Sequence, residues 1–202
     1  MLRPNSLVPD LSFCGPLKNR TAMAKLPIII APDPRLKITA TPVDKVDKAV
    51  RKFMDDLLDT MYAAPGIGLA APQVGVAKRI LVIDLAQKDS PAAPLQIVNP
   101  KLIWASEELA SNEEGCLSLP NQYAEIKRSK SARIRYLDQQ NVDRELEATG
   151  MLSACLQHEM DHLDGRLFVD HLSRLKRNMI LRKLSKLDHS DGNADHCKMS
   201  TF

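Results

Sequence analysis

The stretch Gln157-His158-Glu159-Met160-Asp161-His162-Leu163-Asp164-Gly165 contains the strongest local signal in the chain, the HExxH pattern at 158–162. We expect a helix over residues 150–163 that stops at Asp164-Gly165. Histidines at positions i and i+4 lie on one helix face and can converge on a single metal ion. Glu159 follows the first histidine directly, so its carboxylate could take a proton from a water molecule that the metal activates.

A catalytic metal site also needs a third protein ligand, and an isolated HExxH pattern arises by chance on amphipathic helices. Cys116, within Glu114-Gly115-Cys116-Leu117-Ser118, is the preferred candidate for this ligand. The alternative is that Cys116 is a small buried hydrophobic residue, the usual role of a lone cysteine. Cys155 competes for the role, but it precedes His158 on the same helix. We therefore expect Cys155 to pack beside the site rather than bind the metal.

The glycine-rich segment Gly66-Ile67-Gly68-Leu69-Ala70-Ala71-Pro72-Gln73-Val74-Gly75 offers a neutral side-chain amide at Gln73. Such an amide can donate a hydrogen bond to the oxyanion that develops during attack on a carbonyl. Taken alone, the segment is better explained as a turn between a helix and a strand. It is not a phosphate-binding loop, because no Gly-Lys-Ser/Thr follows and no strand precedes it.

The remaining pattern predicts an α+β domain with mostly antiparallel strands and a C-terminal helix. An amphipathic helix is expected to begin near Thr41-Pro42 and to end at Pro65-Gly66. Strands are expected at 79–85, at 94–99 before Pro100, at 132–137 and, paired with the last of these, at 143–149. The C-terminal helix is expected over 173–187.

The length of 202 residues fits one domain, which we place at 23–188. Residues 1–22 are interpreted as a disordered extension, with an organellar transit peptide as the alternative, and 189–202 as a disordered tail. The composition, 44% hydrophobic and 26% charged, is that of an ordinary globular protein. No apolar run is long enough to span a bilayer, so no membrane association is expected.

Four cysteines, Cys14, Cys116, Cys155 and Cys197, are far apart and form no CxxC pair. A disulfide scaffold is not expected in a chain of this size, so the cysteines indicate a reducing compartment, which we take to be the cytoplasm.

Three segments together resemble the peptide deformylase family. They are GxGLAAxQ at 66–73, EGCLS at 114–118 and QHExDHLxG at 157–165, in this order and without interruption. The resemblance extends from about residue 23 to 187. It implies a fold with antiparallel strands around a central helix that carries HExxH with its two histidines. It also implies a hydrolase that removes the N-formyl group from the formyl-methionine of newly synthesised polypeptides and releases formate.

The resemblance also implies roles for individual residues. Cys116, His158 and His162 would bind one divalent metal, and Glu159 would be the general base and then the general acid. Gln73 and the backbone N–H of Leu117 would hold the formyl oxygen, and Gly68 would pair with the substrate backbone. The walls of an apolar methionine pocket are expected at Ile67, Leu117, Met151, Ala154 and Cys155. Family enzymes work best with Fe²⁺ and tolerate Ni²⁺, Co²⁺ or Zn²⁺.

One departure from the family pattern concerns the peptide substrate. Many bacterial members have Pro-x-Gln-Arg after EGCLS, whereas this chain has Tyr123 in place of the arginine, which leaves open its preference beyond methionine.

Residues 171–187 contain no Asp or Glu but include Arg174, Lys176, Arg177, Arg182, Lys183 and Lys186. We interpret this helix as a ribosome-docking surface, with a merely solvated basic face as the alternative.

The apolar residues of this helix give a further expectation. Leu172, Leu175 and Met179 share one face, which is expected to pack on the domain, while Leu181 falls on the opposite face as part of a partner surface.

Two other functional classes compete with deformylation. A peptidase of the HExxH type would need a third ligand downstream of His162, but Asp164 and Gly165 follow and the chain has no HxxGxxH. A ribosome-associated binding protein without catalysis would have no reason to keep the metal ligands, the base and the oxyanion donor together. Metal content and formate release from a formyl-Met peptide separate these possibilities.

Overall fold

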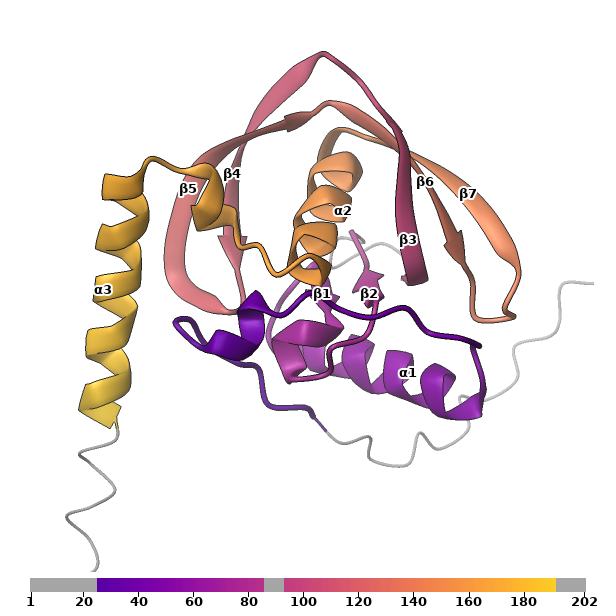
Figure 1. Cartoon of the computed structure of the whole chain (residues 1–202), viewed down its shortest axis with the longest axis horizontal. Coiled ribbons are helices and arrows are strands. Elements are labelled where there is room, and N and C mark those ends of the chain that lie inside the picture. Colours follow the sequence, from indigo (N-terminus) through magenta and orange to yellow (C-terminus); the bar gives the residue numbers. More distant parts are fainter. Residues whose placement is uncertain (1–24, 86–92, 192–202) are drawn as a thin grey trace, which may run out of the picture.

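The computed structural model describes residues 25–85 and 93–191 of the chain. Figure 1 shows one helix, α2 (Gly150–Leu163), enclosed between strands, with α1 (Lys48–Ala63) below it and α3 (Arg174–Asp191) at one side. The extension predicted at 1–22 lies outside the described residues. Among the described residues, no helix has both the length and the apolar composition that crossing a membrane would require.

Two antiparallel sheets surround α2. The larger has the strand order β1-β2-β3-β6-β7 and the smaller pairs β4 with β5. The strands are β1 (Gly68–Ala70), β2 (Ile80–Ile83), β3 (Leu95–Ala105), β4 (Leu109–Cys116), β5 (Leu119–Ser129), β6 (Ser131–Leu137) and β7 (Asp143–Thr149). Short 3-10 turns are η1 (Pro34–Lys37), η2 (Ala71–Val74) and η3 (Phe168–His171). The predicted α+β class with antiparallel strands is therefore confirmed.

The central position of α2 follows from its composition. Leu156 and Leu163 on this helix are fully buried against Leu81, Ile97 and Ile134 of the larger sheet. The opposite side of the helix carries the polar residues of the site described below. The predicted bounds of α2 and the predicted hairpin of β6 with β7 are confirmed. Both could be predicted because they depend on local periodicity.

The expected start of α1 at Thr41-Pro42 is wrong, because the helix begins at Lys48. Its N-cap is Asp47, whose side chain accepts a hydrogen bond from the N–H of Val50. The backbone N–H groups of Val43 and Val46 instead donate to the side chains of Asn99 and Asn141. Both valines are still buried, so the apolar pattern predicted burial correctly but not helix.

The expected end of a strand at Pro100 is also wrong, because β3 continues to Ala105. The register with β6 shifts between Val98 and Lys101, and Asn99 in this irregularity has φ 52°. A proline lacks an N–H to donate and is tolerated in a strand at such a bulge.

The sequence prediction missed the β4–β5 hairpin. Its inward-facing positions include Glu114, Gln122 and Arg128, all of which are buried. Polar residues occupy these positions, so the alternation of apolar and polar residues is weak. This alternation is the pattern that predicts a half-buried strand.

The expected packing of α3 is confirmed for Leu172, which packs on the domain, but is wrong for the rest of the predicted face. Leu184 is fully buried with Ile29 and Phe168, and Leu181 packs against the same cluster. Leu175 and Met179 are instead 72% and 63% exposed. The helix also extends to Asp191, past the predicted boundary at 188, and the rest of the predicted tail lies outside the described residues.

Candidate active site

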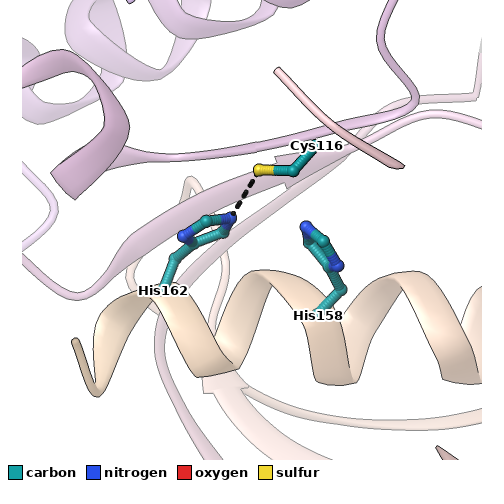
Figure 2. Close-up of side chains that lie close together, drawn as sticks. All are labelled: Cys116, His158 and His162. Atoms are coloured by element: carbon teal, nitrogen blue, oxygen red, sulfur yellow. Dashed lines mark hydrogen bonds between the residues drawn. The ribbon is translucent and has the colours of Figure 1, made fainter. Parts of the chain in front are cut away.

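Three potential metal ligands meet between β4 and α2. Figure 2 shows His158 and His162 rising from α2 toward Cys116, which ends β4. One ligand atom from each residue lies within 4.8 Å of the others, and Sγ of Cys116 is 3.3 Å from Nε2 of His162. The helix spacing alone places the two histidines together. Only the fold brings the thiol to them, because Cys116 precedes His158 by 42 residues in the chain.

A buried network of charges supports His158. Oε2 of Glu114 lies 2.8 Å from Nδ1 of this histidine, and both Glu114 oxygens are held by the guanidinium of Arg128 at 2.6 and 2.9 Å. Arg128 also donates to Asp161 at 2.7 Å, and Asp161 lies 2.7 Å from Nε2 of His171. Burial opposes ionisation of Glu114, but the bonds from Arg128 and His158 lower its pKa to about 2.

The pKa values of the two buried histidines are shifted in opposite directions. Burial lowers the pKa of His162 well below its ordinary value, which keeps this ring neutral as a metal ligand must be. Its Nδ1 is buried without a hydrogen-bond partner among the described residues. Burial also opposes charge on His158, but hydrogen bonds with Cys116 and Glu114 raise its pKa well above the ordinary value. One thiol and two imidazoles form a donor set that fits a divalent transition metal.

Glu159 lies beside this cluster and is 4% exposed. Burial raises the pKa of its carboxyl to about 7, partly offset by His158 and Arg128, so the group can take up and release a proton near neutrality. Its Oε2 has no hydrogen-bond partner among the residues that the structure describes. Its Oε1 lies against the backbone of Gly68, where a β-carbon would come within 2.4 Å of it. The absence of a side chain at Gly68 therefore leaves the room that Glu159 occupies.

The amide of Gln73 has a fixed orientation. Its Oε1 accepts a hydrogen bond of 2.8 Å from the N–H of Ala70. Its Nε2 therefore faces the other way, 3.2 Å from Oγ of Ser118 and 3.5 Å from Sγ of Cys116. The donor end of this amide therefore lies on the side of Cys116, where it could donate to an oxyanion that forms beside this residue.

A cavity of about 500 Å³ opens onto these groups. Its lining contains every residue expected to wall a methionine pocket, namely Ile67, Leu117, Met151, Ala154 and Cys155. It also contains Gly68, Gln73, Cys116, His158 and Glu159, whereas His162 lies behind them and is fully buried. A cavity of this size holds a side chain of a few heavy atoms together with the backbone that follows it.

Cys155 is a wall residue of this cavity. Its thiol is buried, and burial raises its pKa well above the ordinary value, so it stays protonated. Its Sγ lies 3.8 Å from the carbonyl oxygen of Ile67 rather than in the cluster of potential ligands. This agrees with the prediction that Cys155 packs beside the site.

Several residues around the potential ligands carry no signal in the sequence that assigns them a role. Ser118, Arg128, Asp161 and His171 were not assigned roles, although Ser118 and Asp161 belong to the motif segments. Arg128 belongs to none of the three segments, and only its contacts with Glu114 and Asp161 reveal its position.

Comparisons with known proteins agree with this arrangement. A family model described as Polypeptide deformylase matches residues 25–178. The chain is 54% identical over 163 residues to a peptide deformylase of Methylocella silvestris, covering 79% of this chain and 83% of that protein. It is 52% identical over 161 residues to a peptide deformylase of Mesorhizobium japonicum, covering 80% of this chain and 92% of that protein.

Solved structures give the same result. The crystal structure of peptide deformylase from Ehrlichia chaffeensis superposes with a TM-score of 0.79 at 40% identity, covering 83% of this chain and 99% of that one. The structure of the E. chaffeensis enzyme in complex with actinonin superposes with a TM-score of 0.78 at 41% identity, covering 81% and 98%.

Proposed function

The chain belongs to the polypeptide deformylase family, and from this premise we propose which of its residues carry out the reaction. It is a metal-dependent hydrolase that removes the N-formyl group from the formyl-methionine of newly synthesised polypeptides. The observation that carries the assignment of residues is the convergence of Cys116, His158 and His162 beside Glu159 at the bottom of a cavity. We assign residues 23–188 to the catalytic domain.

Cys116, His158 and His162 are the proposed ligands of one divalent metal ion. The neutral ring of His162 and the Nδ1 bond of His158 to Glu114 leave an imidazole nitrogen of each available for coordination. When bound, a divalent ion supplies Lewis acidity that polarises the formyl group and makes water more acidic. Fe²⁺ is our proposed native metal, with Ni²⁺, Co²⁺ or Zn²⁺ as substitutes, in line with the family resemblance and the thiol and imidazole donors.

Glu159 is the proposed general base and then general acid. Its buried carboxyl, with a pKa of about 7, takes a proton from the attacking water and passes it to the leaving nitrogen. The carbon–nitrogen bond of the formamide breaks, formate leaves, and the peptide keeps a free amine. The Glu159→Gln variant should retain the metal but lose on the order of 10²-fold or more in kcat. A variant with near wild-type kcat would show that another group is the base.

Gln73 and the backbone N–H of Leu117 are the proposed donors to the formyl oxygen. The fixed amide of Gln73 is oriented before the substrate arrives, so no reorganisation is needed as charge develops. Gly68 is the proposed partner of the substrate backbone, and Ile67, Met151, Ala154 and Cys155 are the proposed contacts of the methionine side chain.

Release of formate from a formyl-Met tripeptide, measured together with metal content, tests this function. Deformylation is shown by release of formate while the peptide bonds of the substrate stay intact. Cleavage of a peptide bond would indicate a peptidase instead, and metal-free protein that only binds ribosomes would indicate a binding factor.

The choice of iron has its own test. A cysteine thiolate beside Fe²⁺ in an accessible site is open to oxidation by oxygen or peroxide. Activity of the iron form should therefore decay in air while the nickel form persists. Equal loss of activity in the iron and nickel forms would contradict oxidation at the iron site as the cause of inactivation.

We also propose that the basic face of α3 docks on the ribosome, where formylated chains emerge, and that the reaction takes place in the cytoplasm. The basic residues of this helix that are exposed are Arg174, Lys176, Arg182, Lys183 and Lys186. Arg177 is half-buried and pairs with Asp170. Five exposed cations on one helix favour contact with phosphates. An organelle is the alternative location if residues 1–22 are a transit peptide.

A further inference from the structure

The 3-10 turn η3 reaches His158 in two ways. Phe168, the first residue of the turn, is fully buried and stacks on the imidazole of His158, with 6.3 Å between the ring centroids and 23° between the ring planes. His171, the last residue of the turn, is bonded to Asp161, which belongs to the buried network behind the same imidazole. The first contact is apolar packing, and the second is a chain of hydrogen bonds.

The outer end of this chain is the bond between His171 and Asp161. Nε2 of His171 lies 2.7 Å from Oδ2 of Asp161, and Arg128 donates to the same oxygen at 2.7 Å. Because this oxygen already accepts from a guanidinium, Nε2 of His171 is the donor. The exposed fraction of the side chain is 29% for His171, 16% for Asp161 and 5% for Arg128. Two hydrogen bonds therefore connect a partly exposed imidazole with a buried guanidinium.

Arg128 carries the constraint farther inward. Its Nη1 donates to Asp161, while its Nε and Nη2 donate to the two oxygens of Glu114 at 2.6 and 2.9 Å. A guanidinium is planar and its donors form a rigid fork, so its orientation toward one partner fixes its orientation toward the other. Oε2 of Glu114 in turn lies 2.8 Å from Nδ1 of His158. The position of Asp161 therefore affects the position of the His158 ring.

His171 restricts the carboxylate of Asp161. With Arg128 as its only side-chain partner, this partly exposed carboxylate could rotate and exchange its second donor for water. His171 instead supplies a second fixed donor to the same oxygen. A partly exposed contact of this kind contributes little to the stability of a fold, so its main effect is on the orientation of the groups that it joins.

The backbone of η3 is held without the His171 side chain. Asp170 accepts a hydrogen bond of 2.8 Å from the N–H of Leu167 and forms ion pairs with Lys37 and Arg177. None of these contacts involves the imidazole of His171. We therefore expect η3 to keep its place when this side chain is replaced, so an effect on orientation can be separated from an effect on folding.

We propose that His171 is a positioning residue that fixes the imidazole of His158. It acts through three side chains in turn, Asp161, Arg128 and Glu114. The inference rests on the proposed role of His158 as a metal ligand, because a tilt of Glu114 at Nδ1 moves Nε2, the nitrogen left for the metal. His171 itself touches neither the metal ligands nor the cavity among the described residues.

The test compares Co²⁺ binding by wild-type protein, His171→Leu and His171→Gln. Leucine fills a similar volume but has no donor, and the Nε2 amide of glutamine can replace the donor of His171. His171→Leu should bind Co²⁺ about three- to ten-fold more weakly, which is less than the 10- to 100-fold loss typical of a group bonded directly to a ligand. It should also shift the visible absorption bands of the bound ion, because the ligand geometry changes.

Two further measurements separate positioning from stability. The kcat for a formyl-Met peptide should fall in His171→Leu while KM stays as in wild type, because His171 does not line the cavity. In metal-free protein labelled with ¹⁵N-histidine, the Nδ1–H of His158 should exchange with water faster in His171→Leu. His171→Gln should restore the Co²⁺ affinity, the absorption bands, kcat and the exchange rate.

The control is Asp138→Asn, at the turn between β6 and β7. Asp138 accepts hydrogen bonds from the backbone of Gln140 and Val142 and from the side chain of Arg144. This variant should be less stable than wild type but should leave the Co²⁺ bands and affinity unchanged. If His171→Leu does not fold, His171→Asn takes its place, since its shorter amide does not reach the position of Nε2.

Unchanged Co²⁺ affinity, absorption bands and kcat in the folded variant without a donor would overturn the inference. A loss that His171→Gln does not restore, or an equal change of the bands in Asp138→Asn, would also overturn it. Failure of wild-type protein to bind Co²⁺ would instead count against the proposed metal site.

Discussion

Oε2 of Glu114 on β4 lies 2.8 Å from Nδ1 of His158 on α2. Since the pKa of Glu114 is lowered to about 2, its carboxylate is ionised and accepts the hydrogen bond, so Nδ1 of His158 carries the proton. The other ring nitrogen, Nε2, is then left for the metal. A residue two positions before Cys116 thus selects the tautomer of a histidine contributed by a different element.

Replacing Glu114 tests this relationship. In Glu114→Gln the guanidinium of Arg128, which is 5% exposed, loses the charge of its bidentate partner and keeps only Asp161. We expect the free energy of unfolding to fall by about 3 kcal/mol and the metal affinity to fall about 10- to 100-fold. Urea unfolding and metal titration measure the two effects.

The matched control is Glu108→Gln. Glu108 forms an exposed ion pair with Lys130, so its loss should cost less than about 1 kcal/mol. Equal stability of the two variants would show that the buried network does not stabilise the site.

The two described cysteines provide a paired test of the ligand set. Cys116→Ala removes a charged ligand and should abolish tight metal binding, measured as metal per chain after dialysis. Cys116→Asp should hold a metal with altered reactivity, because a carboxylate is a harder ligand. Cys155→Ala should retain the metal, since that thiol packs on Ile67 and stays protonated. Full metal occupancy and normal activity in Cys116→Ala would refute the assignment.

A methyl group at Gly68 should damage catalysis without unfolding the protein. The added β-carbon would lie 2.4 Å from Oε1 of Glu159 and 2.9 Å from Sγ of Cys155, so the carboxyl must move. We expect Gly68→Ala to lose about 10²-fold in kcat/KM, a typical effect of misplacing a reacting group by about an ångström. Metal content should not change.

Gly66→Ala is the comparison for this variant. Its β-carbon would meet the end of the flexible Leu117 side chain at 2.8 Å, so it should lose less activity. A Gly68→Ala variant as active as wild type would mean that the position of Glu159 is not restricted by this contact.

Stability at acid pH should depend on Asp170. Burial opposes its ionisation, but Lys37, the N–H of Leu167 and Arg177 together lower its pKa. A carboxylate with a depressed folded-state pKa contributes stability above the unfolded pKa of about 3.9. This contribution is lost as the pH falls through the lower folded-state pKa. Wild-type protein should therefore lose unfolding free energy below about pH 4, and Asp170→Asn should be less stable at pH 7 but show less of this acid dependence.

Asp44→Asn is the control for Asp170. Asp44 is exposed and forms no ion pair among the described residues, so its replacement should leave the acid dependence as in wild type. Identical pH profiles of wild type and Asp170→Asn would contradict the assigned role.

The docking surface on α3 is best tested by charge reversal rather than deletion. Deleting the helix would remove Leu184 from the core and damage the domain itself. The triple variant Arg182→Glu, Lys183→Glu and Lys186→Glu should hydrolyse a short formyl-Met peptide like wild type. It should co-sediment less with ribosomes, and added salt should weaken wild-type binding in the same way.

The control for charge reversal changes three exposed lysines elsewhere, Lys45, Lys48 and Lys101, to glutamate. If ribosome binding weakens equally in both triple variants, overall charge rather than the face of α3 is responsible.

The elements that the sequence predicted correctly depend on interactions between residues close along the chain. The bounds of α2 follow from a 3.6-residue period and the stop at Asp164-Gly165, and the β6–β7 hairpin follows from strict alternation. The two histidines share a helix face for the same reason. Three motif segments in order were enough to indicate the family, and through it to predict the metal ligands and the base.

Other features were decided only when distant parts of the chain met. α1 begins late because Asn99 and Asn141 bind the backbone that was expected to open the helix. The side of α3 that packs on the domain is set by the burial of Leu184 in a cluster with Ile29 and Phe168 and by the ion pair of Arg177 with Asp170. No local period of the sequence encodes these interactions.

The same holds for the surroundings of the site. Arg128 reaches Glu114 and Asp161 from a strand whose buried positions are polar, so neither the strand nor the network has an apolar signature in the sequence. The periodicity of apolar residues predicts which side of a helix or strand is buried, because hydrophobicity is a property of each residue by itself. It does not report which polar groups satisfy one another inside, because that depends on pairs of residues that only the tertiary structure brings into contact.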